Sequence, residues 1–165
     1  LRLVAWTANH DIGDSGLDSL SVLRLVDRLS DRGHVVISSE TPLPPELDAL
    51  RFRGRVSDMH HLMAFCAGYF GESATMASEC AVLGVPAVYA ANSPRGYTDE
   101  QESRYGLVRN VRMLAPAALE AACDWLLAQS PEAMRERRAR LLAESVDVAA
   151  FVADTVRAAA AAGRG

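Results

Sequence analysis

Residues 67–88 constrain the fold more than any other part of the chain, because they combine strand, turn, helix and strand signals in immediate succession. An apolar pair precedes a turn of small residues, and a helix is predicted to begin at Ser73. Gly84 ends this helix, and Pro86 leads into a second apolar run. A strand that leads so directly into a helix and a further strand is typical of parallel α/β sheets.

The remaining chain repeats this alternation of apolar runs and amphipathic segments. Strands are predicted at residues 1–6, 34–38, 52–54, 69–70, 87–88 and 107–111. Helices are predicted at residues 17–32, 46–50, 58–66, 73–83, 99–105, 116–128, 131–143 and 147–160. We therefore expect a three-layer α/β/α Rossmann-like parallel sheet of about six strands. In such a fold the loops after the strands meet at the carboxyl edge, where ligands bind.

Composition excludes several classes of protein. The net charge of −4 gives no basic face for nucleic acid. No apolar run reaches membrane-spanning length, and no signal peptide is recognisable. Cys66, Cys80 and Cys123 are widely spaced in apolar segments, which is typical of buried thiols in a cytosolic protein. We expect a cytoplasmic location.

The sequence does not complete any of three common kinds of catalytic or binding motif. The sequence G-E-S-A-T at residues 71–75 resembles the G-x-S-x-G elbow of serine hydrolases, but every histidine precedes Ser73 in the chain. No G-x-G-x-x-G follows the first strand, and no lysine is present for a Walker A loop. His60 and His61 are adjacent, so they point in different directions on a helix, and no spaced ligand completes a metal site.

The start of the helix after Ser73 is a candidate anion site, since helix N-termini present unpaired N–H groups and a positive dipole end. Glu79 lies on the flank of the same helix, on a stripe with Thr75. Two interpretations remain open from the pattern alone. Glu79 either complements the helix dipole or accepts both hydroxyls of a ribose.

Residues 72–86, E-S-A-T-M-A-S-E-C-A-V-L-G-V-P, resemble without a gap the D-S-G-G-x-x-E-E-A-x-x-L-G-x-P stretch of UDP-N-acetylglucosamine 2-epimerases. That family has the GT-B fold, which many nucleotide-sugar glycosyltransferases share. Across residues 6–152 the chain is also similar to a prokaryotic GT-B-like family called domain of unknown function 354. The stretches concerned are W-T-A-N-H-D-I-G-D-S-G, I-S-S-E-T-P-L-P, T-M-A-S-E-C-A-V-L-G-V-P, E-S-R-Y-G-L-V and V-D-V-A-A-F-V.

The resemblance implies roles for the residues of this helix. Ser73 falls on the family's phosphate-contacting serine, and Ala74 and Thr75 fall on its paired glycines. Glu79 falls on the ribose-binding glutamate. The implied diphosphate site therefore spans residues 73–75, where two larger side chains crowd the place that the glycines leave open.

The loop after the first strand supplies the other implied residues. His10 falls where epimerases have a histidine, and it is the implied catalytic residue, close to the phosphates or the sugar. Asn9 and Gly16 complete the implied nucleotide- and phosphate-binding set. The G-H-R-R-E-N loop of the epimerases is absent, so the shared position of His10 does not carry epimerase chemistry with it.

The resemblance also implies the domain organisation. Residues 1–145 would form the nucleotide-binding domain, the C-terminal half of a GT-B protein whose N-terminal domain is missing from this sequence. Residues 146–160 would form a helix that packs on that missing domain or pairs with a second copy as a homodimer. Residues 161–165 would be a tail.

The implied function is binding of a nucleotide diphosphate sugar, with UDP-sugar favoured. The full-length protein would be a glycosyltransferase or sugar 2-epimerase-like enzyme of envelope polysaccharide synthesis, touching a membrane only through an acceptor lipid. The half-domain alone is expected to be inactive, and neither cofactor nor metal is expected. The alternatives are a non-catalytic GT-B-like binding or interaction module and, in third place, a serine hydrolase.

Overall fold

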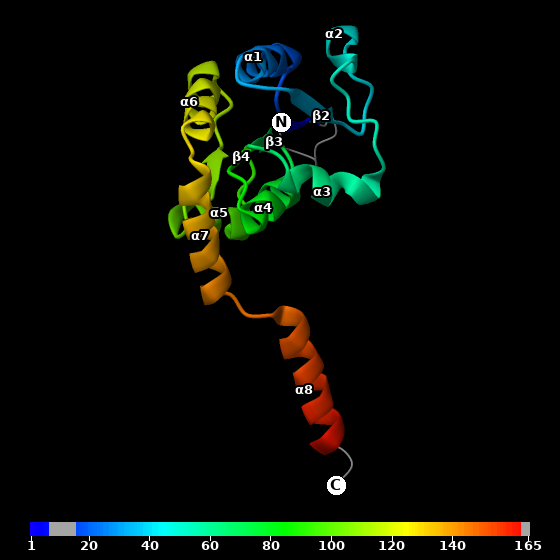
Figure 1. The fold of residues 1–165 in the computed structure, drawn as a ribbon, viewed down its shortest axis with the longest axis vertical. Coiled ribbons are helices and arrows are strands. Elements are labelled where there is room, and N and C mark those ends of the chain that lie inside the picture. The colour runs from blue at the N-terminus through cyan, green and yellow to red at the C-terminus, as the bar shows by residue number, and fades with distance from the viewer. Residues whose placement is uncertain (7–15, 163–165) are drawn as a thin grey trace.

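A sheet of five parallel strands forms the centre of the computed structural model, which describes residues 1–6 and 16–162 (Figure 1). The strands are β1 (Arg2–Ala5), β2 (Val35–Ser38), β3 (Tyr69–Gly71), β4 (Ala87–Ala90) and β5 (Val108–Val111). Their order in the sheet is β2-β1-β3-β4-β5. β3 and β4 are buried along their whole length, as expected of central strands with helices on both faces. β3 is the middle strand, and its carboxyl end leads directly into the predicted site.

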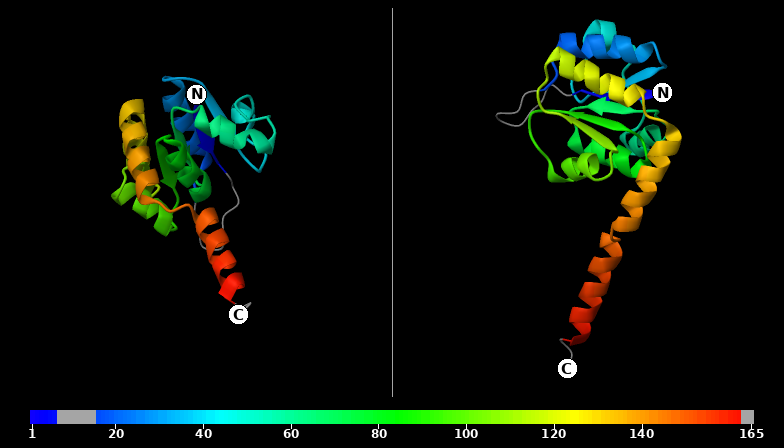
Figure 2. Two further views of the ribbon diagram at one scale, coloured as in Figure 1. Left: turned by 60° about the horizontal axis from the view of Figure 1, so that its bottom comes forward. Right: turned by 90° about the vertical axis from the view of Figure 1, so that its left-hand side faces the viewer.

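Helices cover both faces of the sheet, which confirms the predicted three-layer architecture (Figure 2). They are α1 (Ser19–Ser30), α2 (Pro45–Asp48), α3 (Met59–Ala64), α4 (Ala74–Leu83), α5 (Gly96–Ser103), α6 (Pro116–Leu127), α7 (Pro131–Glu144) and α8 (Val148–Ala162), with a 3₁₀ turn at Val56–Asp58. α1 and α6 lie on one face, and α3, α4, α5 and the start of α7 lie on the other.

Alternating residues of the central strands divide the apolar interior between the two faces. Phe70 and Val88 pack with α1 and α6. Tyr69 and Ala87 pack with α3, α4 and α7. This period of two follows from the pleat of the strands, and it locks the register of β3 against β4 because a one-residue slip would exchange the two faces.

The helix that follows β3 begins and ends where the sequence predicts. Ser73 is the N-cap, and its hydroxyl accepts a hydrogen bond from the Met76 N–H at 3.3 Å. Gly84 has the left-handed conformation at φ 81°, and the following Val85 N–H bonds back to the Cys80 carbonyl at 2.8 Å. Both ends of α4 are therefore determined by residues within the helix or directly next to it.

One of the six predicted strands, at residues 52–54, is not formed. Arg51 makes an isolated bridge to Ile37, and the Phe52 N–H bonds to the Ile37 carbonyl at 2.8 Å, but the pairing ends there. The guanidinium groups of Arg51 and Arg53 both bind Asp48 of α2, at 3.3 and 2.7 Å. These contacts draw the chain back toward α2 and away from the edge of β2.

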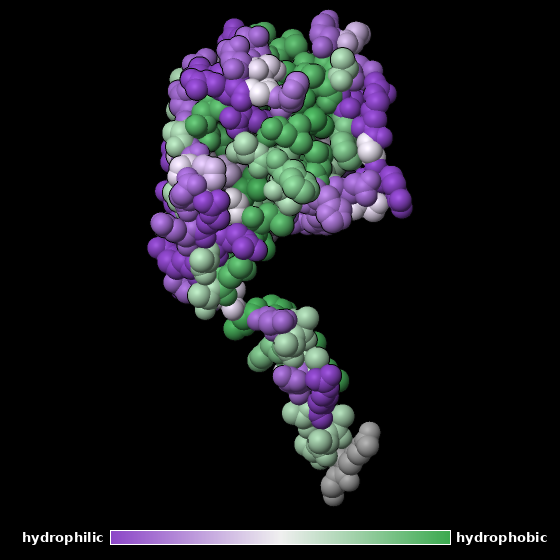
Figure 3. All heavy atoms as spheres, in the orientation of Figure 1, coloured by the Kyte–Doolittle hydropathy of each residue, from purple (hydrophilic) through white to green (hydrophobic). Residues whose placement is uncertain are grey.

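α8 extends away from the rest of the molecule and buries none of its residues (Figure 1). The apolar face predicted on this helix is exposed to solvent: Val148, Phe151, Val152 and Val156 retain 51–65% of their accessible surface (Figure 3). α8 runs to Ala162, two residues beyond the predicted boundary at 160. Among the described residues, no helix has both the length and the apolar character needed to cross a membrane.

Candidate functional site

The predicted site lies at the turn between β3 and α4, at the carboxyl edge of the sheet. Two hydrogen bonds fix the backbone of this turn around Ser73. The Tyr69 hydroxyl donates to the Ser73 carbonyl at 3.0 Å, and the Ala77 N–H donates to the same carbonyl at 3.0 Å. Burial raises the pKa of the Tyr69 hydroxyl well above its usual value, so this hydroxyl remains a donor at neutral pH.

Gly71 brings the turn into close contact with β1. A Cβ at this position would overlap the carbonyl oxygen of Ala5 and lie 2.8 Å from both the Ala5 Cβ and the Tyr69 hydroxyl. The next residue, Glu72, donates its N–H to the Ala5 carbonyl at 3.1 Å. Only glycine permits this approach of the two strands.

Glu72 connects the turn to the segment before α1. Its side chain is 8% exposed, and its Oε1 accepts a hydrogen bond from the Leu17 N–H. The indole N–H of Trp6 donates to the Leu17 carbonyl at 3.0 Å. Both backbone groups of Leu17 are therefore held at the carboxyl edge, and this places Gly16 beside the turn that carries Ser73.

The structure brings together four of the predicted site residues: Gly16, Ser73, Ala74 and Thr75. Asn9 and His10 lie outside the described residues. Ala74 is 8% exposed and belongs to the interior cluster, so its methyl group packs inside the protein. Thr75 is exposed, so of the two residues that align with the paired glycines of the epimerase motif, Thr75 carries the side chain on the solvent side.

Glu79 lies on the outer flank of α4, in its second turn. Its carboxylate Oε1 is 3.3 Å from Nε2 of His60, which belongs to the first turn of α3. The two side chains retain 37% and 68% of their accessible surface. A depression of about 230 Å³ adjoins the pair, lined by His60, Ser78, Glu79, Val82 and Leu83.

The sequence patterns did not identify Glu72 or the contact between His60 and Glu79. Glu72 was present in the matched motif, but its partner Leu17 is 55 residues away in the chain. For His60 the sequence favours an ordinary position on a capped helix over a role as metal ligand, and it gives no sign of the contact with Glu79. In the described part of the chain, no cluster of three or more His, Cys, Asp or Glu side chains is arranged to hold a metal ion.

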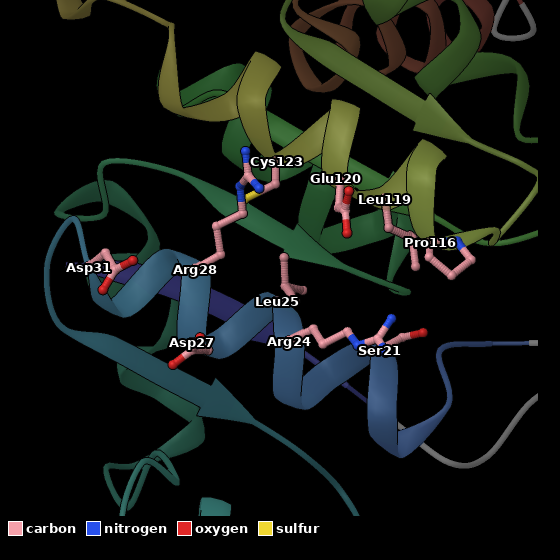
Figure 4. A pocket seen from close by; sticks show the side chains of 10 residues that line it. All are labelled: Ser21, Arg24, Leu25, Asp27, Arg28, Asp31, Pro116, Leu119, Glu120 and Cys123. Carbon is pink, nitrogen blue, oxygen red and sulfur yellow. The ribbon is translucent and has the colours of Figure 1, made fainter.

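A second groove, of about 320 Å³, lies between α1 and α6, away from the predicted site (Figure 4). Leu25 and Leu119 contribute apolar surface, and charged side chains of both signs surround them. One of these, Arg28, is paired with Asp124. None of the residues that line the groove belongs to the predicted site, and we assign it no role.

The architecture defines a Rossmann-like α/β domain similar to the C-terminal domains of GT-B glycosyltransferases. The chain is similar to the calicheamicin glycosyltransferase CalG4, with 22% identity over 95% of this chain and 41% of that one, at a TM-score of 0.58. It is also similar to the kitacinnamycin glycotransferase, with 15% identity over 86% of this chain and 39% of that one, at a TM-score of 0.57.

A third similar structure is a protein assigned as a UDP-N-acetylglucosamine 2-epimerase from Listeria monocytogenes. It shows 16% identity over 84% of this chain and 39% of that one, at a TM-score of 0.51. This chain therefore spans about two fifths of the length of each of these structures. No protein-family model matches the chain, and no curated protein matches it in sequence.

Proposed function

We propose that this chain is the nucleotide-sugar-binding half of a two-domain glycosyltransferase or sugar 2-epimerase-like protein, with a UDP-sugar as the favoured ligand. One observation carries the proposal: the cap of α4 lies at the carboxyl end of the middle strand β3, with Gly16 held beside it. Open α/β sheets bind their ligands at this edge.

The diphosphate would bind at the first turn of α4. Ser73 occupies two of the N–H groups of this turn, since its hydroxyl accepts from Met76 and its carbonyl from Ala77. The N–H groups of Ala74 and Thr75 precede them and have no partner within the helix. They would donate to phosphate oxygens, with the exposed Thr75 hydroxyl as a further donor.

Glu79 would accept the ribose hydroxyls. Glu79 lies one turn after Thr75 on α4, and helical side chains lean toward the N-terminus of their helix, which would bring its carboxylate toward the proposed diphosphate. In this proposal Asn9 contacts the phosphates, and His10 approaches a phosphate or the oxygen of the leaving group. Those last two roles rest on the sequence resemblance alone.

The second domain would supply the opposite wall of the cleft. The chain spans about two fifths of the similar structures, which leaves length in them for a second domain. In this proposal residues 1–145 form the nucleotide-binding domain and residues 146–160 form a helix that docks elsewhere. The exposed apolar face of α8 would contact that second domain, or another copy of the chain. The proposed role is envelope polysaccharide synthesis, and the unpaired buried cysteines support a cytoplasmic site of action.

Calorimetry with UDP, GDP and their N-acetylhexosamine conjugates at millimolar concentration tests the proposal. We expect binding without turnover. Glu79→Ala is expected to weaken binding by about 1–3 kcal/mol, because a hydrogen-bonded charged acceptor is lost. Glu136→Ala, an exposed helical glutamate on α7, is the matched control and should leave affinity unchanged. If no nucleotide diphosphate binds, the proposed function is wrong.

A non-catalytic binding module is the second candidate. The exposed, branched Thr75 favours it, since this side chain narrows the place where the family's glycine admits the diphosphate. Adding the second domain distinguishes the two functions: sugar transfer or epimerisation by the joined protein supports the enzyme, and binding without either supports the module. The serine-hydrolase alternative makes a separate prediction, namely labelling of Ser73 by a fluorophosphonate probe.

A further inference from the structure

We infer that His60 positions Glu79 for ribose recognition and thereby makes the site selective for ribonucleotides over 2′-deoxyribonucleotides. This inference rests on the proposed function of Glu79. It comes from one contact between two helices: Nε2 of His60, at the start of α3, lies 3.3 Å from Oε1 of Glu79 in α4. The motif on α4 does not contain His60, so this residue adds a second element to the site.

The contact leaves most of the carboxylate available. A carboxylate has two oxygens with about four acceptor positions, and His60 approaches only Oε1, at 3.3 Å. Among the described residues, no other cationic side chain pairs with the Glu79 carboxylate. Oε2 and the remaining position of Oε1 can therefore accept two adjacent hydroxyls, which is the number that a ribose presents and one more than a 2′-deoxyribose presents.

Glu79 needs such a partner because its side chain is partly exposed, with 37% of its surface accessible. A free glutamate samples several rotamers, and ordering it on binding lowers affinity by about twofold to tenfold. The contact with His60 restricts the Glu79 side chain before the ligand binds. Removing His60 is therefore expected to weaken ribonucleotide binding by about threefold to tenfold.

A shallow depression adjoins the pair on the side of the last turn of α4. The adjoining depression of about 230 Å³ has Val82 and Leu83 as its apolar lining. Its third polar residue, Ser78, is engaged by the buried Gln101, whose Nε2 donates to the Ser78 hydroxyl at 2.9 Å. Glu79 and His60 are thus the polar groups of the depression that can be aligned toward a ligand.

The test compares UDP with 2′-deoxy-UDP, and GDP with 2′-deoxy-GDP, by calorimetry on four forms of the full chain. These are the wild type, His60→Leu, His60→Gln and His61→Leu. His61 is the matched control, because it is the adjacent exposed histidine of α3. We expect the wild type and His61→Leu to prefer the ribonucleotide to the same degree. His60→Leu should lose most of that preference, and His60→Gln should restore it, because the glutamine amide replaces the donor.

Each outcome decides between the inference and the proposed function. If the wild type binds none of the four nucleotides, the proposed function and this inference both fail. If Glu79→Ala weakens binding but His60→Leu retains the wild-type preference, only the inference fails. Tighter ribonucleotide binding by His60→Leu would show that His60 competes with the sugar, and this also overturns it. In the free protein, Glu79→Gln should shift the imidazole ¹⁵N resonances of His60 and not those of His61; no shift would refute the contact.

Discussion

Gly71→Ala tests whether the close approach of β3 to β1 holds the candidate site together. The added methyl group would overlap the Ala5 carbonyl oxygen and lie 2.8 Å from the Ala5 Cβ. Both neighbours belong to the paired strand, so relief requires the two central strands to separate. Overpacking of this kind costs about 1–3 kcal/mol. We expect the free energy of unfolding to fall by about 2 kcal/mol, which lowers the Tm of a domain of this size by about 4–8 °C.

Gly96→Ala is the matched control, measured by the same thermal unfolding followed by circular dichroism. Gly96 is the first residue of α5, and apart from its chain neighbours and the backbone of its own helix, no heavy atom of the described residues lies within 4 Å of the position that its Cβ would take. Alanine is favoured over glycine in a helix by about 0.5–1 kcal/mol, so the Tm should stay constant or rise slightly. If Gly71→Ala has the same Tm as the wild type, the close approach of β3 to β1 does not limit stability, because the strands can then separate without a loss of free energy.

Three further predictions concern the rest of the chain. Glu72→Ala should cost about 1.5–3 kcal/mol in urea unfolding, because the Leu17 N–H loses a charged acceptor; an effect as small as that of Glu136→Ala would contradict the role of Glu72. Removing residues 146–165 should change the Tm by less than about 2 °C, since α8 buries no residue, and a larger loss would place α8 against the domain. Burial raises the pKa of the Cys66 thiol to about 11, so the unfolded chain binds fewer protons than the folded one in alkaline solution. Stability should therefore hold at neutral pH and fall as the pH rises from about 9 toward 11, which urea unfolding across that range measures.

The parts of the fold that the sequence predicts are those with local causes. The N-cap of α4 needs Ser73 and an N–H three residues on, and its end needs Gly84. The failed prediction of a strand at residues 52–54 shows the opposite case. Those residues have the pattern of a short strand, but the two arginine contacts to Asp48 depend on where α2 packs. The strand propensity of these residues says nothing about the contacts of Arg51 and Arg53 with Asp48.

The same distinction applies to the candidate site. Ser73, Ala74 and Thr75 are adjacent in sequence, so one motif specified them together. The bond between Glu72 and Leu17 depends on the sheet order β2-β1-β3, which places the ends of two strands side by side although 55 residues separate the partners. His60 meets Glu79 only because α3 packs beside α4. Neither the Glu72–Leu17 hydrogen bond nor the His60–Glu79 contact could be inferred from spacing along the chain.

These contacts divide the site into two parts with different physical requirements. The proposed diphosphate part, at Ser73 to Thr75, is held by Gly71 and Glu72, which also join the central strands, so a change there is expected to alter stability and binding together. The proposed ribose part, Glu79 with His60, lies on the surface of α3 and α4, where substitutions usually change stability by less than about 0.5 kcal/mol. Substitutions in the proposed ribose part are therefore expected to change selectivity without loss of the fold, whereas substitutions in the proposed anion-binding turn are expected to destabilise it. Variants of the ribose part are for this reason the cleaner probes of function, since their effect on binding is not mixed with an effect on folding.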